Sequence, residues 1–139
     1  MTDLPVNDLL QHAMAARERA YAPYSHFLVG AAIHCVGDGK IFAGCNVENA
    51  SYGGTICAER SAIVSMVSQR GFCRIDGVVV VTNAEPASCP CGLCLQVLAE
   101  FCSPSTPVYL ANLNGIQKQL TMQELLPHSF TEVPGPAAS

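Results

Sequence analysis

The sequence predicts an α/β protein, a three-layer α/β/α sandwich around a mixed, mostly parallel sheet. Residues 78–82 are all β-branched and have no polar face, which is typical of a strand covered on both sides. Strand and helix patterns alternate in the second half of the chain, which implies parallel strands joined by right-handed crossovers. Two apolar runs flank the turn residues Gly37, Asp38 and Gly39, which predicts an antiparallel hairpin at the edge of the sheet.

In the first half of the chain, hydrophobic periodicity and turn residues place the elements. Apolar residues recur at helical spacing over residues 6–21, which predicts an amphipathic helix that stops before Pro23. Residues 26–36 and 41–47 are the two extended runs of the hairpin, and the Gly- and Ser-containing residues 49–55 are expected to form a loop.

In the second half, two helices alternate with strands. Residues 58–69 read as a helix with Gly71 as its terminator, and residues 91–101 read as a second, shorter one. Residues 107–111 predict another strand. Thr121 and Glu124 have the spacing of a capping box, which predicts a last short helix.

Composition predicts one compact domain, residues 1–139, with residues 131–139 as a flexible tail. The chain has 139 residues, and half of them are hydrophobic, which is enough for one core. Only 13% are charged and the net charge is −4, which argues against nucleic acid as a partner. The first residues do not resemble a signal peptide, so we expect a cytoplasmic protein whose eight cysteines stay reduced. No apolar run is long enough to cross a bilayer, so we expect no membrane partner.

Three cysteines and one glutamate form the pattern that carries chemistry. Cys91 and Cys94 have Cys-x-x-Cys spacing at a predicted helix start, and Cys57 lies at another helix start. Three protein ligands with an open fourth position are typical of catalytic zinc. Glu59 follows Cys57 by two residues, where it can handle the protons of a metal-bound water without binding the metal. This is the pattern of zinc-dependent nucleobase deaminases.

The charge of such a site needs compensation. Helix N-termini favour thiolate over thiol, and Arg60 can donate to the sulfurs and offset part of the excess negative charge. Two alternatives remain open: a buried or redox cysteine pair, and a structural zinc closed by a fourth ligand such as Cys89. The other cysteines are expected to be ordinary packing residues; they are Cys35, Cys45, Cys73 and Cys102.

Several motifs together resemble the short, homotetrameric, zinc-dependent cytidine deaminases. They occur in order over nearly the whole chain and at family-like spacing. They are Tyr21-Ala22-Pro23-Tyr24-Ser25-His26-Phe27, Val29-Gly30-Ala31-Ala32, Gly44-Cys45-Asn46-Val47-Glu48-Asn49-Ala50, Cys57-Ala58-Glu59-Arg60, Pro90-Cys91-Gly92-Leu93-Cys94 and Glu124-Leu125-Leu126-Pro127.

The resemblance implies hydrolytic deamination of cytidine and deoxycytidine to uridine and deoxyuridine, with release of ammonia, as in pyrimidine salvage. It implies one zinc per subunit, bound by Cys57, Cys91 and Cys94. Glu59 matches the proton shuttle, and Arg60 matches the residue that hydrogen-bonds the ligand sulfurs.

The resemblance also assigns the substrate contacts. Asn46 and Glu48 match the pair that holds the ribose hydroxyl, and Phe27 matches the aromatic residue beside the pyrimidine. Ala58 matches a position whose backbone meets the base edge. Tyr52 and Phe130 match aromatic residues that, in a homotetramer, reach into the active site of a neighbouring subunit.

Two residues depart from the family pattern. Leu95 stands where an arginine usually follows the last zinc cysteine, and Cys89 stands where serine is common. We expect Leu95 to pack into the core, because the replacement is apolar rather than merely uncharged. The competing functions are a deaminase of a modified cytidine or an aminonucleoside antibiotic, a non-catalytic zinc-binding module, and an editing enzyme on nucleic acid, which the acidic balance disfavours.

Overall fold

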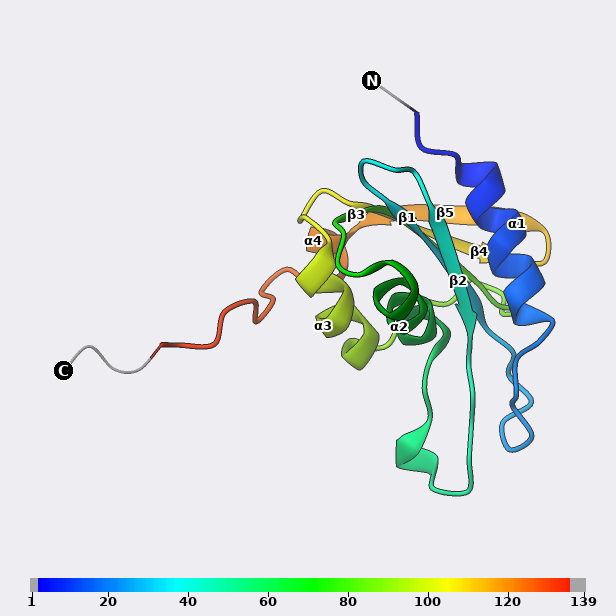
Figure 1. Cartoon of the computed structure of the whole chain (residues 1–139). Helices are drawn as coiled ribbons and strands as arrows, with labels where there is room; N and C mark the ends of the chain where they lie inside the picture. The colour runs from blue at the N-terminus through cyan, green and yellow to red at the C-terminus, as the bar shows by residue number, and fades with distance from the viewer. Residues whose placement is uncertain (1–2, 136–139) are drawn as a thin grey trace.

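The computed structural model describes residues 3–135 (Figure 1). Among them, no helix has the length and apolar character needed to cross a membrane. Of the predicted tail, residues 131–135 form no helix or strand, and residues 136–139 lie outside the described part. The elements are α1 (Val6–Arg17), β1 (Gly30–Cys35), β2 (Ile41–Cys45), η1 (Tyr52–Gly54), α2 (Ala58–Arg70), β3 (Ile75–Val81), α3 (Gly92–Phe101), β4 (Pro107–Asn112), β5 (Gly115–Thr121) and α4 (Met122–Leu125).

The strands form one sheet in the order β2-β1-β3-β4-β5. Only β3 and β4 are parallel; the pairs β1–β2, β1–β3 and β4–β5 are antiparallel. The α/β class and the mixed sheet are therefore confirmed, whereas "mostly parallel" is wrong. The parallel pair is the one joined through a helix, α3, and the tight turn between β4 and β5 can only join antiparallel neighbours.

Strand β5 is the element that the sequence patterns missed. Its middle is polar, since Gln117, Lys118 and Gln119 separate the apolar residues Ile116 and Leu120. A strand at the edge of a sheet needs little apolar surface, so its hydrophobic signal is weak. Backbone hydrogen bonds to β4 define this strand, because its own side chains give little hydrophobic pattern.

Helices cover both faces of the sheet, which confirms the three layers (Figure 1). On one face, α1 packs through Leu9, Leu10 and Ala13 onto Ala32, Val79, Val81 and Ala111. On the other face, α2 and α3 pack through residues such as Ala62, Met66, Leu95 and Leu98 onto Ile33, Val78, Val80 and Val108. Alternate residues of β3 thus enter the two cores, as predicted for a strand buried on both sides.

Two glycines bring the helices directly against the hairpin. A Cβ atom at Gly30 would lie 2.0 Å from the carbonyl oxygen of Ala13 in α1. A Cβ atom at Gly44 would lie 2.4 Å from the backbone nitrogen of Ala62 in α2. Neither approach tolerates a side chain, so these glycines fix how closely α1 and α2 can approach the sheet.

Local signals set some boundaries and tertiary contacts set others. The capping box of Thr121 and Glu124 is present at α4, and α2 ends at Gly71 with a φ of 92°. Helix α1 stops at Arg17, before the predicted residue 21, because Tyr21 leaves the helix to pair with Val47. Strand β1 begins only at Gly30, because side chains bind the preceding residues, as described below.

We expect Leu95→Arg to destabilise the fold, because Leu95 is only 7% exposed and lies in the core beneath α3. A buried cation without a partner should lower the free energy of unfolding by more than about 3 kcal/mol. Leu95→Met is the matched control and should cost under about 1.5 kcal/mol. Urea unfolding of the variants measures both effects. An arginine variant within about 1 kcal/mol of the parent would show that the side chain escapes the core.

Candidate metal and active site

The site lies at the end of the sheet where β1 begins and β2 and β3 end. Gly30 sits opposite Cys45 on one side and Val81 on the other. The segments before β1, after β2 and after β3 therefore meet there. The N-terminal ends of α2 and α3 reach the same place, so residues far apart in the sequence line one cavity.

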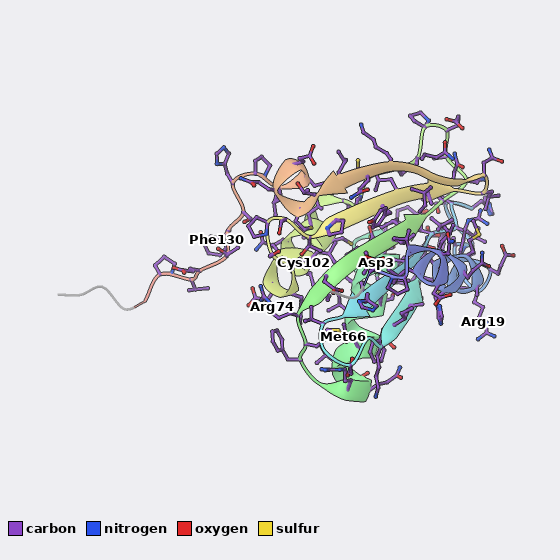
Figure 2. All side chains as sticks on the ribbon, turned by 90° about the horizontal axis from the view of Figure 1, so that it is seen from above. Asp3, Arg19, Met66, Arg74, Cys102 and Phe130 are labelled. Carbon is purple, nitrogen blue, oxygen red and sulfur yellow. The ribbon has the colours of Figure 1, made fainter. Side chains whose placement is uncertain are left out.

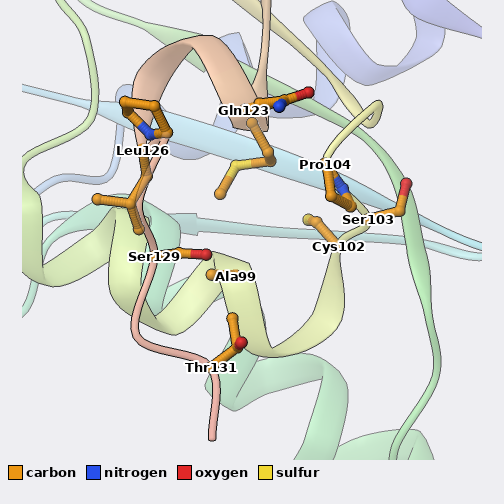
Figure 3. Close-up of a pocket in the computed structure, with 10 residues that line it drawn as sticks. Ala99, Cys102, Ser103, Pro104, Gln123, Leu126, Ser129 and Thr131 are labelled. Atoms are coloured by element: carbon orange, nitrogen blue, oxygen red, sulfur yellow. The ribbon is translucent and has the colours of Figure 1, made fainter.

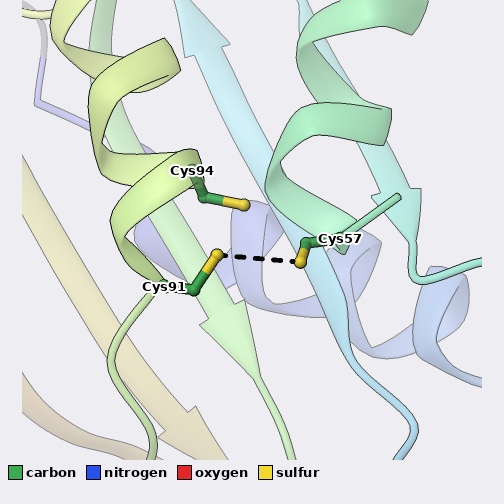
Figure 4. A group of neighbouring side chains, drawn as sticks. All are labelled: Cys57, Cys91 and Cys94. Carbon is green, nitrogen blue, oxygen red and sulfur yellow. Dashed lines mark hydrogen bonds between the residues drawn. The ribbon is translucent and has the colours of Figure 1, made fainter. Parts of the chain in front are cut away.

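The sulfurs of Cys57, Cys91 and Cys94 come together at the two helix starts (Figure 4). Cys57 precedes the first residue of α2, Cys91 precedes that of α3, and Cys94 lies in the first turn of α3. The three sulfurs lie within 4.8 Å of one another, and those of Cys57 and Cys91 are 3.8 Å apart. Zinc–sulfur bonds of about 2.3 Å in a tetrahedron place two sulfurs about 3.8 Å apart. The cluster therefore fits a tetrahedral metal ion.

Hydrogen bonds stabilise negative charge on the sulfur of Cys57. Arg60 Nη2 donates to the sulfur of Cys57 over 3.6 Å and to the carbonyl oxygen of Thr55 over 3.1 Å. Hydrogen bonding from Cys94 first, and from Arg60 next, lowers the pKa of Cys57 to about 5. The same bond raises the pKa of Cys94, which acts as its donor. A thiolate is the form that binds a metal, so Cys57 is prepared for one, whereas Cys94 must release its proton when a metal binds.

Glu59 is buried beside the cluster. Its side chain belongs to the first turn of α2, is 3% exposed, and lines the same cavity as Cys57 and Cys91. Burial raises the pKa of this carboxyl group to about 7. A carboxyl group with this pKa can both accept and release a proton near neutral pH, as general acid–base catalysis requires.

The cavity has a volume of about 260 Å³. Of the predicted substrate contacts, Phe27, Asn46 and Glu48 line it. Cys57, Glu59 and Cys91 line it as well, whereas Cys94 is buried behind them. Cys89, which the sequence analysis weighed as a fourth zinc ligand, also lines the cavity. The sequence analysis did not assign a role to the remaining lining residues, which lie on loops and strand ends. They are Ser25, Val29, Thr55, Val80, Thr82 and Ser88.

Asn46 is 6% exposed, and both ends of its amide bind the segment before β1. Its Oδ1 accepts from the backbone N–H of Val29 over 2.9 Å, and its Nδ2 donates to the carbonyl oxygen of Phe27 over 2.8 Å. Asn46 therefore holds Phe27 in the cavity wall. Among residues 3–135, the second hydrogen of this amide has no acceptor, so it can bind a ligand.

Glu48 binds the same loop from the other side. Its Oε1 accepts from the backbone N–H groups of Tyr24 and Ser25, over 3.0 and 3.1 Å. The hydroxyl of Ser25 donates to Oε2 over 2.5 Å. These bonds, that of the hydroxyl foremost, lower the pKa of Glu48. The carboxylate is thus ionised and oriented at neutral pH.

Three predicted substrate contacts do not line this cavity: Tyr52, Ala58 and Phe130. Tyr52 is 72% exposed and packs edge-on against Tyr24, with ring centroids 5.4 Å apart. It lines a neighbouring hollow of about 310 Å³ that shares Ser25, Glu48 and Thr55 with the cavity. Ala58 is fully buried between Cys57 and Glu59, with its side chain in the core.

Phe130 also lies away from the cavity of its own chain. It is 60% exposed and belongs to the C-terminal segment that leaves the body of the molecule (Figure 2). Its carbonyl oxygen accepts a hydrogen bond from the side chain of Gln96. Its neighbours Ser129 and Thr131 line a small hollow of about 110 Å³ against Ala99 of α3 (Figure 3). The segment is therefore docked on α3, while the ring itself remains available.

Leu95 and Cys89, the two departures from the family pattern, lie in different environments. Leu95 lies in the core, as expected, and leaves Arg60 as the cation that contacts the cluster. Cys89 is exposed and lines the cavity, but its sulfur is not among the clustered ones. Within residues 3–135, the clustered group contains no fourth ligand, which favours an open metal position over a closed structural site.

Comparison with known families agrees with this geometry. The model described as "Cytidine and deoxycytidylate deaminase zinc-binding region" matches residues 5–110. The chain belongs to this deaminase family. The match includes the segments before and after β2 and the starts of α2 and α3, so the clustered cysteines and Glu59 lie within it.

Individual members of the family are similar over most of the chain. The cytidine deaminase of Sporosarcina psychrophila is 46% identical over 129 residues, which is 93% of each chain. That of Halalkalibacterium halodurans is 47% identical over 123 residues, 88% of this chain and 92% of the relative. The crystal structure of cytidine deaminase from Burkholderia pseudomallei has a TM-score of 0.83 at 44% identity, over 94% of this chain and 100% of that one. For the enzyme from Mycobacterium tuberculosis, the TM-score is 0.79 at 35% identity, over the same shares.

We expect Cys57→Ala, Cys91→Ala and Cys94→Ala each to lose most of the bound metal, because each removes one of the clustered sulfurs. Cys89→Ser is the matched control: it removes a nearby thiol whose sulfur lies outside the cluster, and it should keep its metal. Elemental analysis of the purified variants measures metal per chain. Zinc lost from the Cys89 variant and kept in the Cys91 variant would contradict the ligand assignment.

Proposed function

We propose that this protein is a zinc-dependent cytidine deaminase that converts cytidine and deoxycytidine to uridine and deoxyuridine and releases ammonia, a reaction of pyrimidine salvage. One observation carries the proposal: the buried carboxyl group of Glu59 shares a cavity with Cys57 and Cys91, two of the three clustered cysteines at the helix starts. The family membership of the chain and relatives named cytidine deaminase support it.

Cys57, Cys91 and Cys94 are the residues that would hold one zinc ion in each subunit. When bound at a site with an open fourth position, zinc lowers the pKa of a coordinated water toward neutrality and so makes it a nucleophile. Arg60 and the N-terminal ends of α2 and α3 offset the negative charge of the thiolates. Because Leu95 replaces the usual second cation, Arg60 carries more of this task here.

Glu59 is the proton carrier in this proposal. It takes a proton from the attacking water and delivers it to the ring nitrogen of the pyrimidine. It then takes the remaining proton of the hydroxyl group now bound to carbon 4 and delivers it to the departing amino group, which leaves as ammonia while the carbonyl group of uridine forms. Burial supports this role, because a carboxyl group with a pKa of about 7 can exchange protons with both partners. The low exposure of the side chain also keeps solvent from competing for the proton.

The polar and aromatic lining suits a neutral nucleoside. Phe27 offers a wall for the pyrimidine, and Glu48 and Asn46 offer groups for sugar hydroxyls. None of the described residues that line the cavity is Lys, Arg or His, and Glu48 is ionised. A 5′-phosphate would find no cation there, which favours cytidine over deoxycytidylate, the other substrate in the family description.

We also propose a cytoplasmic homotetramer. A reducing compartment keeps the ligand thiols free, as all eight cysteines are in the structure. The helices that carry the site expose Val64, Val67 and Leu93, and Phe72 beyond α2 is also exposed. Such apolar surface favours burial against other copies. Tyr52 and Phe130 project from the subunit and would reach the site of a neighbour.

The first test is the decay of cytidine absorbance with matched zinc analysis. Deamination of cytidine by protein that holds one zinc per chain is the expected result. A panel of nucleosides, a cytidine nucleotide and an oligonucleotide defines the substrate class. Bound zinc without deamination of any of them would favour a non-catalytic module and would overturn the proposal.

We expect Glu59→Gln to keep its zinc and its fold but to lose nearly all turnover. The amide has the shape of the carboxyl group but cannot carry a proton, and a general acid–base step contributes about 10²–10⁴-fold in rate. Steady-state kinetics and zinc analysis of the same sample separate the two properties. Turnover within about tenfold of the parent would exclude Glu59 from proton transfer.

We expect Phe130→Ala to raise the KM for cytidine and to weaken subunit association, because the exposed ring would contact a neighbouring site. Val133→Ala is the matched control, since it removes an exposed apolar side chain from the same segment. Kinetics and sedimentation velocity measure the two effects. A monomeric Phe130 variant with full activity would contradict the shared site.

A further inference from the structure

Side chains make most of the hydrogen bonds that hold the loop of residues 24–29, beside backbone bonds from the N–H of His26 to Ala22 and from the N–H of Asn46 to Val29. Glu48 accepts three hydrogen bonds, all from Tyr24 and Ser25. On the far side, Asn46 binds Phe27 and Val29. Glu48 and Asn46 therefore anchor separate parts of the loop, and only Glu48 lines both the cavity and the neighbouring hollow.

Ser25 is the link between Glu48 and the aromatic wall. Its hydroxyl donates to Glu48 Oε2 over 2.5 Å and accepts from the backbone N–H of Phe27 over 3.0 Å. His26, between Ser25 and Phe27 in the chain, has a φ of 58°, so the chain makes a tight turn around the hydroxyl of Ser25. Ser25 also lines both the cavity and the neighbouring hollow.

The hydrogen-bonding capacity of Glu48 shows what remains for a ligand. A carboxylate oxygen can accept about two hydrogen bonds. Oε1 already accepts two backbone N–H groups, whereas Oε2 accepts only the hydroxyl of Ser25 among the described residues. The open position is thus on Oε2, and the direction of its lone pair is set by Ser25.

We propose that Ser25 is a positioning residue that aims Glu48 Oε2 at a hydroxyl group of the substrate sugar and so selects nucleosides that carry it. This inference rests on the proposed function and deepens it. The sugar hydroxyl donates to the position on Oε2 that Ser25 leaves open, and Ser25 itself need not touch the substrate.

Because Asn46 holds Phe27 independently of Ser25, the effect of Ser25 on Glu48 can be tested without displacing the aromatic wall. Without the hydroxyl of Ser25, Asn46 still binds the backbone on both sides of Leu28, and Arg17 Nε still donates to the carbonyl oxygen of Leu28 over 3.1 Å. The aromatic wall should therefore persist in Ser25→Ala. The loss should fall on the sugar contact and leave the chemistry at Glu59 unchanged.

The test compares two ligands on matched variants. For Ser25→Ala, the KM for cytidine should rise about tenfold, with kcat within about twofold of the parent. The inhibition constant of 2′,3′-dideoxycytidine, which lacks the sugar hydroxyls, should change less than about twofold. Ser25→Thr keeps a hydroxyl and should restore the KM for cytidine.

Equal weakening of cytidine and 2′,3′-dideoxycytidine in Ser25→Ala would overturn the inference, because it would show that Ser25 merely holds the loop. An unchanged KM for cytidine would overturn it as well. The proposed function stands on turnover of cytidine by the parent protein, so either result with an active parent removes the role of Ser25 alone. A parent that deaminates no nucleoside would remove both proposals.

Discussion

The structure depends on bringing three cysteine sulfurs to one point. Cys57 and Cys91 are separated by 34 positions in the chain, and their sulfurs are 3.8 Å apart. Two helices must therefore begin at the same place, and each must present a cysteine directly before its first residue. The close approach of α2 to the hairpin at Gly44 and the packing of α2 and α3 on one face of the sheet fix that position. Gathered thiolates repel one another, so the arrangement also needs positive charge, which Arg60, the helix ends and a metal ion can supply.

The position of Glu59 follows from the same helix start. Two residues after Cys57, its side chain points into the interior beside the sulfurs, where burial disfavours its charge and raises its pKa to about 7. The same burial that helps to pack the first turn of α2 therefore sets the proton affinity that the proposed reaction uses. Substitutions in the core around α2 can change this chemistry without touching the cavity.

The residues assigned to the sugar are held in place by hydrogen bonds to a loop. Asn46 and Glu48 follow an edge strand, and most of their hydrogen-bonding capacity holds the loop before β1. An ionised carboxylate at the cavity mouth is stable because N–H and O–H groups of the loop surround it. Asn46 and Glu48, which the resemblance assigns to the ribose hydroxyl, thus also hold in place the loop that carries Phe27. Binding and loop structure share one set of hydrogen bonds.

Features that depend on spacing along one element follow from the sequence alone: the positions of the cysteines at helix starts, Glu59 two residues after Cys57, the capping box at Thr121, and the two-sided burial of β3. The meeting of the three sulfurs depends on how the two helices pack. The apolar nature of Leu95 likewise indicated its core position. The strand directions, the pairing of the polar strand β5, and the bonds that join Asn46, Glu48 and Ser25 to one loop are set only when the chain folds. These features arise between segments far apart in the chain, where neither hydrophobic period nor turn residues specify the partner.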